Sequence, residues 1–209
     1  MHICISPTQS DSYTQLPFYD DFEVFDKFYG DVDSTNFGRS VSIDGTTTLI
    51  GSYSSVSVSN CTAYFYEWDG TNWIKDVRIN APAGAGRFGY AVAVYGDRAV
   101  IGATTADNKG AAYVYERTGT NWNYKAKLTA SDAASGDVFG CAVALNDNTV
   151  LVGAYGNNYS KGSAYVFTGS GTNCSESTNM YGTSYSRMGR AVAISDSHIV
   201  VGAPSTPSR

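Results

Sequence analysis

The sequence predicts an all-β fold made of four repeats. A Phe-Gly or Met-Gly pair recurs with its glycine at Gly38, Gly89, Gly140 and Gly189, and a second glycine follows thirteen residues later in every copy. A fixed internal spacing that returns about every 50 residues is the signature of a repeat architecture. The 22 glycines and 16 tyrosines suit short strands joined by tight turns, and no helix is expected.

Each repeat divides into four strand-like pieces, which are clearest in residues 88–128. The first piece, "FGYAVAV" (88–94), alternates bulky side chains with small ones, so we expect it to have two buried faces. A short polar turn leads to the second piece, "AVIGA" (99–103), and such turns favour an antiparallel hairpin. The third piece, "AAYVYE" (111–116), is joined by the turn "TGTNW" to the fourth, "WNYKAKL" (122–128).

The composition of these pieces predicts their order within one sheet. The first strand is rich in glycine and alanine, which suits a crowded inner position where backbones approach each other. The fourth strand carries the charged side chains, which suits an outer edge. We therefore predict an all-β fold of the β-propeller type, built from four-stranded antiparallel blades of about 50 residues. The four visible repeats form either the whole ring or part of a larger one.

The sequence also predicts where the repeats begin and end. Residues 1–21 are expected to be an N-terminal tail or linker, and residues 22–209 to contain the repeats. Phe22 aligns with Trp73, so the repeats open on a fourth strand, and they close after Gly202-Ala203-Pro204 on a second strand. The last blade is then incomplete, and exposed sheet edges recruit partners. We expect this segment to belong to a longer chain or to a self-completing assembly.

The Phe-Gly and Gly-Ala elements, which in the last copy read Gly202-Ala203-Pro204, resemble the FG-GAP repeat family. These repeats form the blades of integrin α-subunit propellers and of many bacterial and algal surface proteins. The resemblance covers roughly residues 22 to 204. It implies a β-propeller, usually with seven blades, and a role in extracellular adhesion or ligand binding, without indicating one ligand.

One feature of integrin-type blades is missing from this sequence. Their calcium loop lies between the Phe-Gly and Gly-Ala-Pro elements, where this chain has only short turns with one isolated acid each, Asp44, Asp97, Asp147 or Asp196. Calcium takes about six to eight oxygen ligands from a loop that wraps the ion. The segment "DVDSTN" (31–36) has a calcium-like composition, but the matching loops of the other repeats do not. We expect no metal and no cofactor.

Charge and composition exclude several classes of function. The formal net charge is −5 and there is no run of Lys or Arg, so neither nucleic acid nor an anionic membrane surface is an expected partner. No apolar run is long enough for direct membrane insertion. The two histidines, His2 and His198, lie in the tail and beside a hairpin turn, so a catalytic base paired with a nucleophile is not indicated. We expect no enzymatic activity.

The candidate binding residues directly follow the Phe-Gly or Met-Gly pairs: Arg39, Tyr90, Cys141 and Arg190. If the first strand of each repeat is innermost, these four lie at one height around one mouth of the axis, where loops on a rigid scaffold usually bind ligands. The alternative is that they are variable rim residues with no ligand. The tryptophans Trp73 and Trp122 are candidates for sugar stacking, but their repeated position at the start of the fourth strand favours a packing role.

The cysteines and glycosylation triplets favour an extracellular or cell-surface location. Four cysteines are disulfide candidates, because their spacing matches no zinc pattern. Three Asn-X-Ser/Thr triplets lie in expected loops or turns, where a glycan can be added. The disulfide candidates are Cys4, Cys61, Cys141 and Cys174, and the glycosylation candidates are Asn60, Asn158 and Asn173.

Two functional hypotheses remain. The first is a non-enzymatic adhesion or ligand-binding module at the cell surface, whose partner is a protein or a glycan. The second is a structural subunit of an extracellular fibre or coat, whose partners are copies of itself joined through incomplete end blades. A fold alone does not decide between them, because function depends on individual sites.

Overall fold

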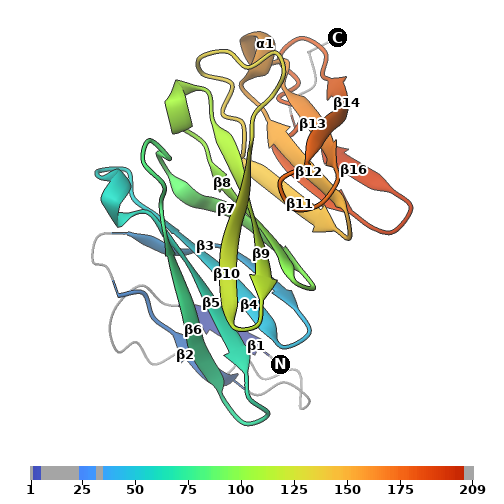
Figure 1. The fold of residues 1–209 in the computed structure, drawn as a ribbon. Helices are drawn as coiled ribbons and strands as arrows, with labels where there is room; N and C mark the ends of the chain where they lie inside the picture. The colour runs from blue at the N-terminus through green and yellow to red at the C-terminus, as the bar shows by residue number, and fades with distance from the viewer. Residues whose placement is uncertain (1, 6–23, 32–34, 205–209) are drawn as a thin grey trace, which may run out of the picture.

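The computed structural model describes residues 2–5, 24–31 and 35–204, and these form an all-β structure in which consecutive sheets follow one another along the chain (Figure 1). We number four of the sheets by the repeat that forms them. Sheet 1 contains β3 (Asn36–Asp44), β4 (Thr47–Tyr53), β5 (Thr62–Trp68) and β6 (Trp73–Asn80); sheet 2 contains β7 (Phe88–Tyr95), β8 (Arg98–Ala103), β9 (Ala111–Thr118) and β10 (Asn121–Leu128); sheet 3 contains β11 (Ala142–Asn146), β12 (Thr149–Ala154), β13 (Ser163–Thr168) and β14 (Ser175–Tyr181); sheet 4 contains β15 (Ala191–Ile194) and β16 (Ile199–Gly202).

Sheets 1 to 3 have the predicted strand order, with every strand antiparallel to its neighbour in sequence. The third and fourth strands of each sheet share a shift in register, between Phe65 and Tyr66 in sheet 1, Tyr124 and Ala126 in sheet 2, and Val166 and Phe167 in sheet 3. Such a bulge increases the local twist of the strand. Sheets 1 to 3 are therefore blade-like units that share their strand order and this irregularity.

The loops between the second and third strands contain short helical turns that the sequence did not predict. These are η1 (Val58–Asn60), η2 (Ala106–Asn108) and α1 (Asn157–Ser160). Asn158 and Tyr159 in α1 have left-handed backbone conformations, so this element is a pair of turns more than a regular helix. None of the helices in the described residues is long and apolar enough to cross a membrane.

The hydrophobic core lies between neighbouring sheets. The faces predicted for the strand at 88–94 are confirmed, because Phe88, Val92 and Val94 pack against sheet 1, whereas Ala93 packs against sheet 3. The bulky side chains of this strand therefore fill the space between sheets 1 and 2, and the small side chain of Ala93 faces sheet 3. A sheet buries both of its faces only when another sheet packs on each side of it.

An aromatic pair recurs inside each of the first three sheets. The phenylalanine of the Phe-Gly pair contacts a tyrosine on the third strand, with ring centroids 5.4, 5.6 and 5.4 Å apart in sheets 1, 2 and 3. The pairs are Phe37 with Tyr64, Phe88 with Tyr113, and Phe139 with Tyr165. Offset or edge-to-face pairs of this kind add to the energy of simple burial.

The second glycine of one repeat meets the first glycine of the next repeat across the boundary between their sheets. A Cβ atom added at Gly102 would overlap the carbonyl oxygen of Gly140, and one at Gly153 would overlap that of Gly189. Gly140 also has φ of +86°, a left-handed conformation that favours glycine. The spacing of thirteen residues therefore places the first glycine of a repeat at the start of its first strand. It places the second glycine in the second strand, where the backbone of the next sheet comes close.

The N-terminal part differs from the prediction. Within the segment expected to be a tail, His2–Ile5 form strand β1, which pairs in parallel with β2 (Val24–Phe28). The first expected fourth strand is therefore present as β2, but its hydrogen-bonded neighbour is β1. The remainder of the expected tail, residue 1 and residues 6–21, lies outside the described residues.

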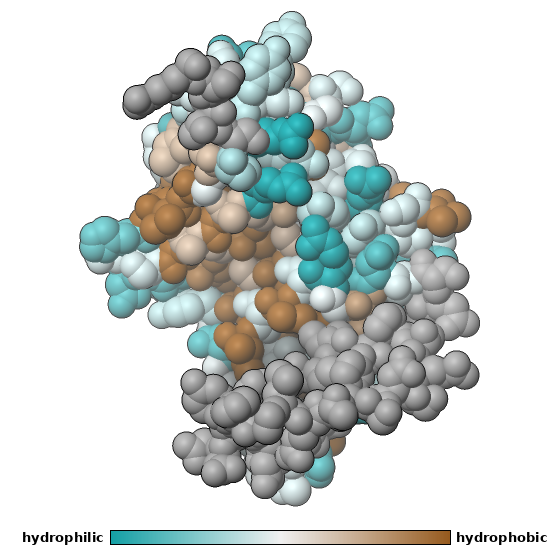
Figure 2. Space-filling view, turned by 180° about the vertical axis from the view of Figure 1, so that it is seen from behind, coloured by the Kyte–Doolittle hydropathy of each residue, from teal (hydrophilic) through white to brown (hydrophobic). Residues whose placement is uncertain are grey.

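Apolar side chains also remain accessible on some strand faces. Figure 2, which views the molecule from behind, shows a gathering of apolar residues on the side turned away from the viewer in Figure 1. Among the exposed apolar residues are Val41 and Ile43 on β3, each 52% exposed, and Ile199 and Val200 on β16, which are 40% and 64% exposed. Sheet 4 has two strands and its apolar side chains are only half covered.

Candidate functional site

The candidate site lies where the first strands begin, and we call it the Phe-Gly rim. It consists of the four side chains that follow the glycines, Arg39, Tyr90, Cys141 and Arg190. Each glycine before them has a positive φ, between 80° and 86°. A left-handed residue at this point turns the chain sharply before the strand, and the added Cβ would meet backbone of the preceding sheet at Gly89, Gly140 and Gly189. Tyr90, Cys141 and Arg190 therefore follow glycines whose backbone packs closely against the preceding sheet.

The structure brings two of the four predicted rim residues into contact. The Arg39 guanidinium lies over the Tyr90 ring, 4.5 Å from its centroid, although the two residues belong to different sheets. Tyr90 in turn contacts Tyr53 at the end of β4, with ring centroids 5.2 Å apart. Arg39 is exposed and the two tyrosines are half-buried. This group places one cation on two aromatic rings at the boundary between sheets 1 and 2.

Arg190 forms a second group of the same kind at the boundary between sheets 3 and 4. Its guanidinium lies 5.1 Å from the centroid of the Tyr155 ring, and the arginine side chain is exposed. Tyr155 follows β12, the position that Tyr53 occupies at the end of β4. Sequence reasoning missed both tyrosines, although their equal distance from the second glycine of each repeat was a usable signal.

Cys141 differs from the other three rim residues because its side chain points inward. The residue is 8% exposed, and its sulfur lies 3.3 Å from the carbonyl oxygens of both Gly153 and Gly189, which share its single S–H donor. Burial raises the pKa of this thiol to about 11, so it is protonated at neutral pH. Only Arg39, Tyr90 and Arg190 therefore present polar or aromatic surface at the rim.

The cysteines predicted to form disulfides are free thiols where the structure describes them. Cys61 is buried at the start of β5 and Cys174 is half-buried in the turn before β14, so neither lies beside Cys141. Cys61 is enclosed by its own loop, where its sulfur accepts from the backbone N–H of Ser54 at 3.2 Å. The fourth candidate, Cys4, lies in β1, and its side chain is outside the described residues. The structure thus does not show the predicted bridges among Cys61, Cys141 and Cys174.

The three glycosylation candidates lie in loops or turns, as the sequence predicted. Asn158 in α1 and Asn173 before β14 are exposed, whereas Asn60 at the end of η1 is half-buried. Asn158 lies at the same end of the sheets as the Phe-Gly rim, and Asn173 lies in the turn at the opposite end. Whether any of them carries a glycan remains a prediction.

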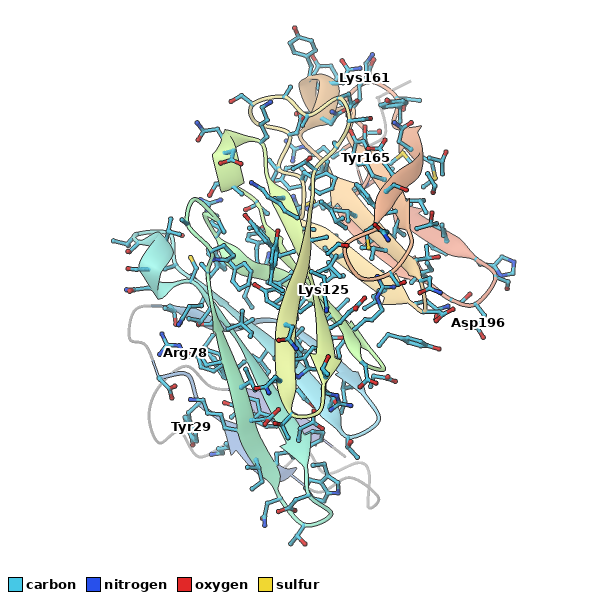
Figure 3. The ribbon with its side chains drawn as sticks, viewed as in Figure 1. Tyr29, Arg78, Lys125, Lys161, Tyr165 and Asp196 are labelled. Carbon is cyan, nitrogen blue, oxygen red and sulfur yellow. The ribbon has the colours of Figure 1, made fainter. Side chains whose placement is uncertain are left out.

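A polar cavity of about 540 Å³ opens beside the rim on sheet 3, and sequence reasoning did not find it. It lies between the loop that precedes β11 and the loop that contains α1, near the end of the molecule where Figure 3 labels Lys161. Two of its carboxylates are already engaged. Asp137 accepts from the Asn157 amide at 3.1 Å, and Asp132 accepts from the hydroxyl of Tyr165 at 2.7 Å. Burial and the Asp132 carboxylate raise the pKa of Tyr165, which keeps this hydroxyl a donor.

No group of three His, Cys, Asp or Glu side chains in the described part of the chain is arranged to hold a metal ion. Three of the four isolated acids of the strand turns bond to other protein groups. Asp44 accepts from the backbone N–H of Gly96 at 2.6 Å, Asp97 pairs with Arg117, and Asp196 accepts from the Asn146 amide at 3.0 Å. Figure 3 shows Asp196 at the turn of sheet 4. Of the calcium-like segment, residues 32–34 lie outside the described residues, and Asp31 forms an ion pair with Lys75.

The chemistry available at the other singled-out residues is limited. His198 contacts Ser197 at 2.7 Å in the exposed turn of sheet 4, where the neighbouring Asp196 is bonded to Asn146 and does not orient the imidazole. The side chain of His2 lies outside the described residues. Trp73 and Trp122 are 7% and 6% exposed, so their predicted packing role is confirmed. They offer no platform at the surface for a sugar ring.

The repeated blade-like sheets, the paired glycines at their boundaries and the loop-bearing rim define a repeat protein whose units depend on their neighbours. The family model described as FG-GAP repeat matches the chain twice, at residues 73–115 and at residues 122–167. These two segments of the chain are therefore similar to the FG-GAP repeat, the family that the sequence motifs predicted. A search of curated proteins found no match to the chain.

Proposed function

We propose that this protein is a non-enzymatic β-propeller module for adhesion or ligand binding, that it acts outside the cell or at the cell surface, and that its ligand binds at the Phe-Gly rim. The observation that carries the proposal is the pair of exposed arginines, Arg39 and Arg190, each stacked on a tyrosine of an adjacent sheet. Fixed side chains on a rigid scaffold are suited to binding because little freedom is lost when a ligand arrives.

The family supports the same proposal. FG-GAP repeats typically occur in extracellular or cell-surface proteins and suggest an adhesion-type propeller that is generally non-enzymatic. The exposed triplets at Asn158 and Asn173 are compatible with that location, because a glycan needs an accessible asparagine.

Retention of cells on surfaces coated with the full chain tests this proposal. The rim variant Arg39→Ala/Tyr90→Ala/Arg190→Ala is compared with a matched variant of the outer strands, Arg78→Ala/Lys125→Ala/Tyr124→Ala. Figure 3 labels Arg78 and Lys125 on β6 and β10. We expect the wild type and the outer-strand variant to retain cells and the rim variant to lose most of them. Equal retention by all three would show that the rim is not the binding surface.

A second function, a structural subunit that binds copies of itself, is favoured by the accessible apolar side chains of β3 and β16. Val41 and Ile43 on β3 occupy the positions that Val92 and Val94 bury against sheet 1 in the next repeat. A second copy of the chain that covered them would bury a similar apolar surface. Sedimentation velocity at increasing concentration tests this function, and the variant Val41→Lys/Val200→Lys should abolish any association. A protein that stays monomeric at about 100 µM, where weak interfaces form, would contradict it.

A further inference from the structure

Two arginines of the rim differ from the other stacked cations of the molecule. Where both the cation and the ring are described, five cationic side chains lie over aromatic rings. Three of these also form an ion pair with a carboxylate: Lys75 with Asp31, Arg117 with Glu67 and Asp97, and Lys127 with Asp107. The remaining two, Arg39 and Arg190, have a ring but no carboxylate within the described part of the chain. Both directly follow the repeat glycine.

The stacking prepares each guanidinium to bind an anion. A guanidinium whose face rests on a ring keeps its N–H donors at the edge, and these match the two oxygens of a carboxylate. Arg39 is further fixed because Tyr90 itself rests on Tyr53. We propose that Arg39 and Arg190 bind the carboxylates of an acidic peptide segment of a partner protein. This inference rests on the proposed function and deepens it, because it assigns a ligand class to the Phe-Gly rim.

The charges around the rim are consistent with this role. Two further exposed arginines, Arg87 and Arg187, directly precede the Phe-Gly or Met-Gly pair in sheets 2 and 4. None of the eight positions that flank the four pairs carries an acidic residue. They are Asn36, Arg39, Arg87, Tyr90, Val138, Cys141, Arg187 and Arg190.

The acidic side chains that the structure describes are either far from the rim arginines or bonded to other groups. The acids in the turns lie at the far end of the first strands, roughly 25 Å away for an eight-residue strand. Exposed charges are screened over about 8 Å at physiological salt. Among the described acids of the loops nearer the rim, Asp31 and Asp107 form ion pairs with Lys75 and Lys127. Asp132 and Asp137 keep their charge but accept hydrogen bonds from Tyr165 and Asn157. Within the described part of the chain, a carboxylate at the rim therefore meets two arginines that form no ion pair.

The same observations favour a peptide over an acidic polysaccharide. The Arg39 and Arg190 guanidinium carbons lie over the Tyr90 and Tyr155 rings, 4.5 and 5.1 Å from their centroids, so a sugar ring could not bind on the same side of these rings. The tryptophans Trp73 and Trp122, which could stack on sugars, are buried. Two separate arginine sites on a chain of net charge −5 also do not form the continuous basic track that a polyanion requires.

The test measures binding of a fluorescein-labelled peptide of alternating Glu and Gly residues to the full chain, by fluorescence anisotropy at low salt. A Gln-Gly peptide is the uncharged control, and polygalacturonate is measured separately as the acidic polysaccharide. The protein variants are Arg39→Gln/Arg190→Gln, Arg39→Lys/Arg190→Lys and Arg78→Gln, the last being the same charge change on β6. Thermal unfolding of each variant confirms that it is folded.

We expect the Glu-Gly peptide to bind and the Gln-Gly peptide not to bind. The double Gln variant should weaken binding about tenfold or more, and the double Lys variant should lose much of that affinity because lysine lacks the planar fork. Arg78→Gln should change binding less than about twofold, since an exposed charge far from the ligand contributes little.

Three results would overturn the inference: no binding of the acidic peptide, a loss with Arg78→Gln as large as with the double Gln variant, or binding of polygalacturonate without binding of the peptide. The last result would reassign the rim to a glycan. If the rim variant still abolished cell retention while the acidic peptide failed to bind, the proposed function would stand and only the ligand class would be wrong.

Discussion

The glycine contacts between sheets predict that the same substitution has opposite effects in two repeats. In Gly102→Ala, the new Cβ would overlap the carbonyl oxygen of Gly140 and lie 3.0 Å from its carbonyl carbon. Both atoms belong to the backbone, so one sheet must shift. In Gly202→Ala, at the equivalent position of sheet 4, the nearest atom is the Ala191 Cβ at 3.4 Å, an ordinary contact. The two variants therefore add the same methyl group, but only in Gly102→Ala does that group overlap neighbouring backbone atoms.

The size of the difference follows from two terms. Overpacking of a well-packed site typically costs about 1–3 kcal/mol. Replacing glycine by alanine also restricts the unfolded chain, which stabilises the protein by about 0.4–1 kcal/mol where the native conformation allows it. Gly102→Ala should therefore lower the free energy of unfolding by about 1–2 kcal/mol, whereas Gly202→Ala should leave it unchanged or raise it slightly.

Urea and thermal unfolding of the two variants measure this difference. For a chain of this size, 1 kcal/mol shifts the melting temperature by about 2–4 °C, so Gly102→Ala should lower it by about 2–8 °C. The Gly202→Ala protein should melt at or slightly above the wild-type temperature. If both variants lost the same stability, the close approach of Gly102 to Gly140 would not be what restricts this position.

Three further predictions concern packing, reactivity and charge. Trp122→Ala should cost about 3–5 kcal/mol, because the indole is buried and stacks on Phe65 at 4.0 Å, and a melting temperature within 2 °C of wild type would contradict this. Burial raises the pKa of Cys141 to about 11, so this thiol should resist alkylation by iodoacetamide at pH 8 until the protein unfolds. Peptide mapping should show the half-buried Cys174 alkylated first, and the reverse order would show that Cys141 is not buried. Arg117→Gln should destabilise by about 1 kcal/mol at low salt and less at high salt, since its two carboxylate partners are partly exposed; a loss that is independent of salt would point to packing instead.

The features that could be predicted from the sequence depend on local pattern and on repetition. Alternation in residues 88–94 correctly separated Phe88 and Val92, which meet sheet 1, from Ala93, which meets sheet 3. Four copies of the same spacing made the strand order consistent from sheet to sheet. The repeated position of Trp122 correctly indicated packing, because a residue that every copy needs is more often structural than ligand-specific.

The features that could not be predicted depend on contacts between distant segments. The glycines before Cys141 and Arg39 both have a positive φ, yet the thiol of Cys141 lies beside two carbonyl groups whereas Arg39 is exposed. The hydrogen bond from Tyr165 to Asp132 joins strand β13 to the loop that precedes β11, a contact between segments 33 residues apart. The parallel pairing of β1 with β2 is likewise a non-local contact.

The matches to the family model clarify why the rim and the sheet boundaries belong together. Each match, at residues 73–115 and 122–167, runs from the fourth strand of one sheet through the third strand of the next sheet. The sequence repeat of the family model therefore spans a boundary between two sheets and does not coincide with one four-stranded sheet. The repeat glycines meet at the same boundaries. Arg39 reaches from sheet 1 to Tyr90 in sheet 2, and Arg190 reaches from sheet 4 to Tyr155 in sheet 3. Because both stacked arginines cross a boundary, the packing of neighbouring sheets also sets the geometry of the rim, and a ligand held there would stabilise the contact between sheets as it binds.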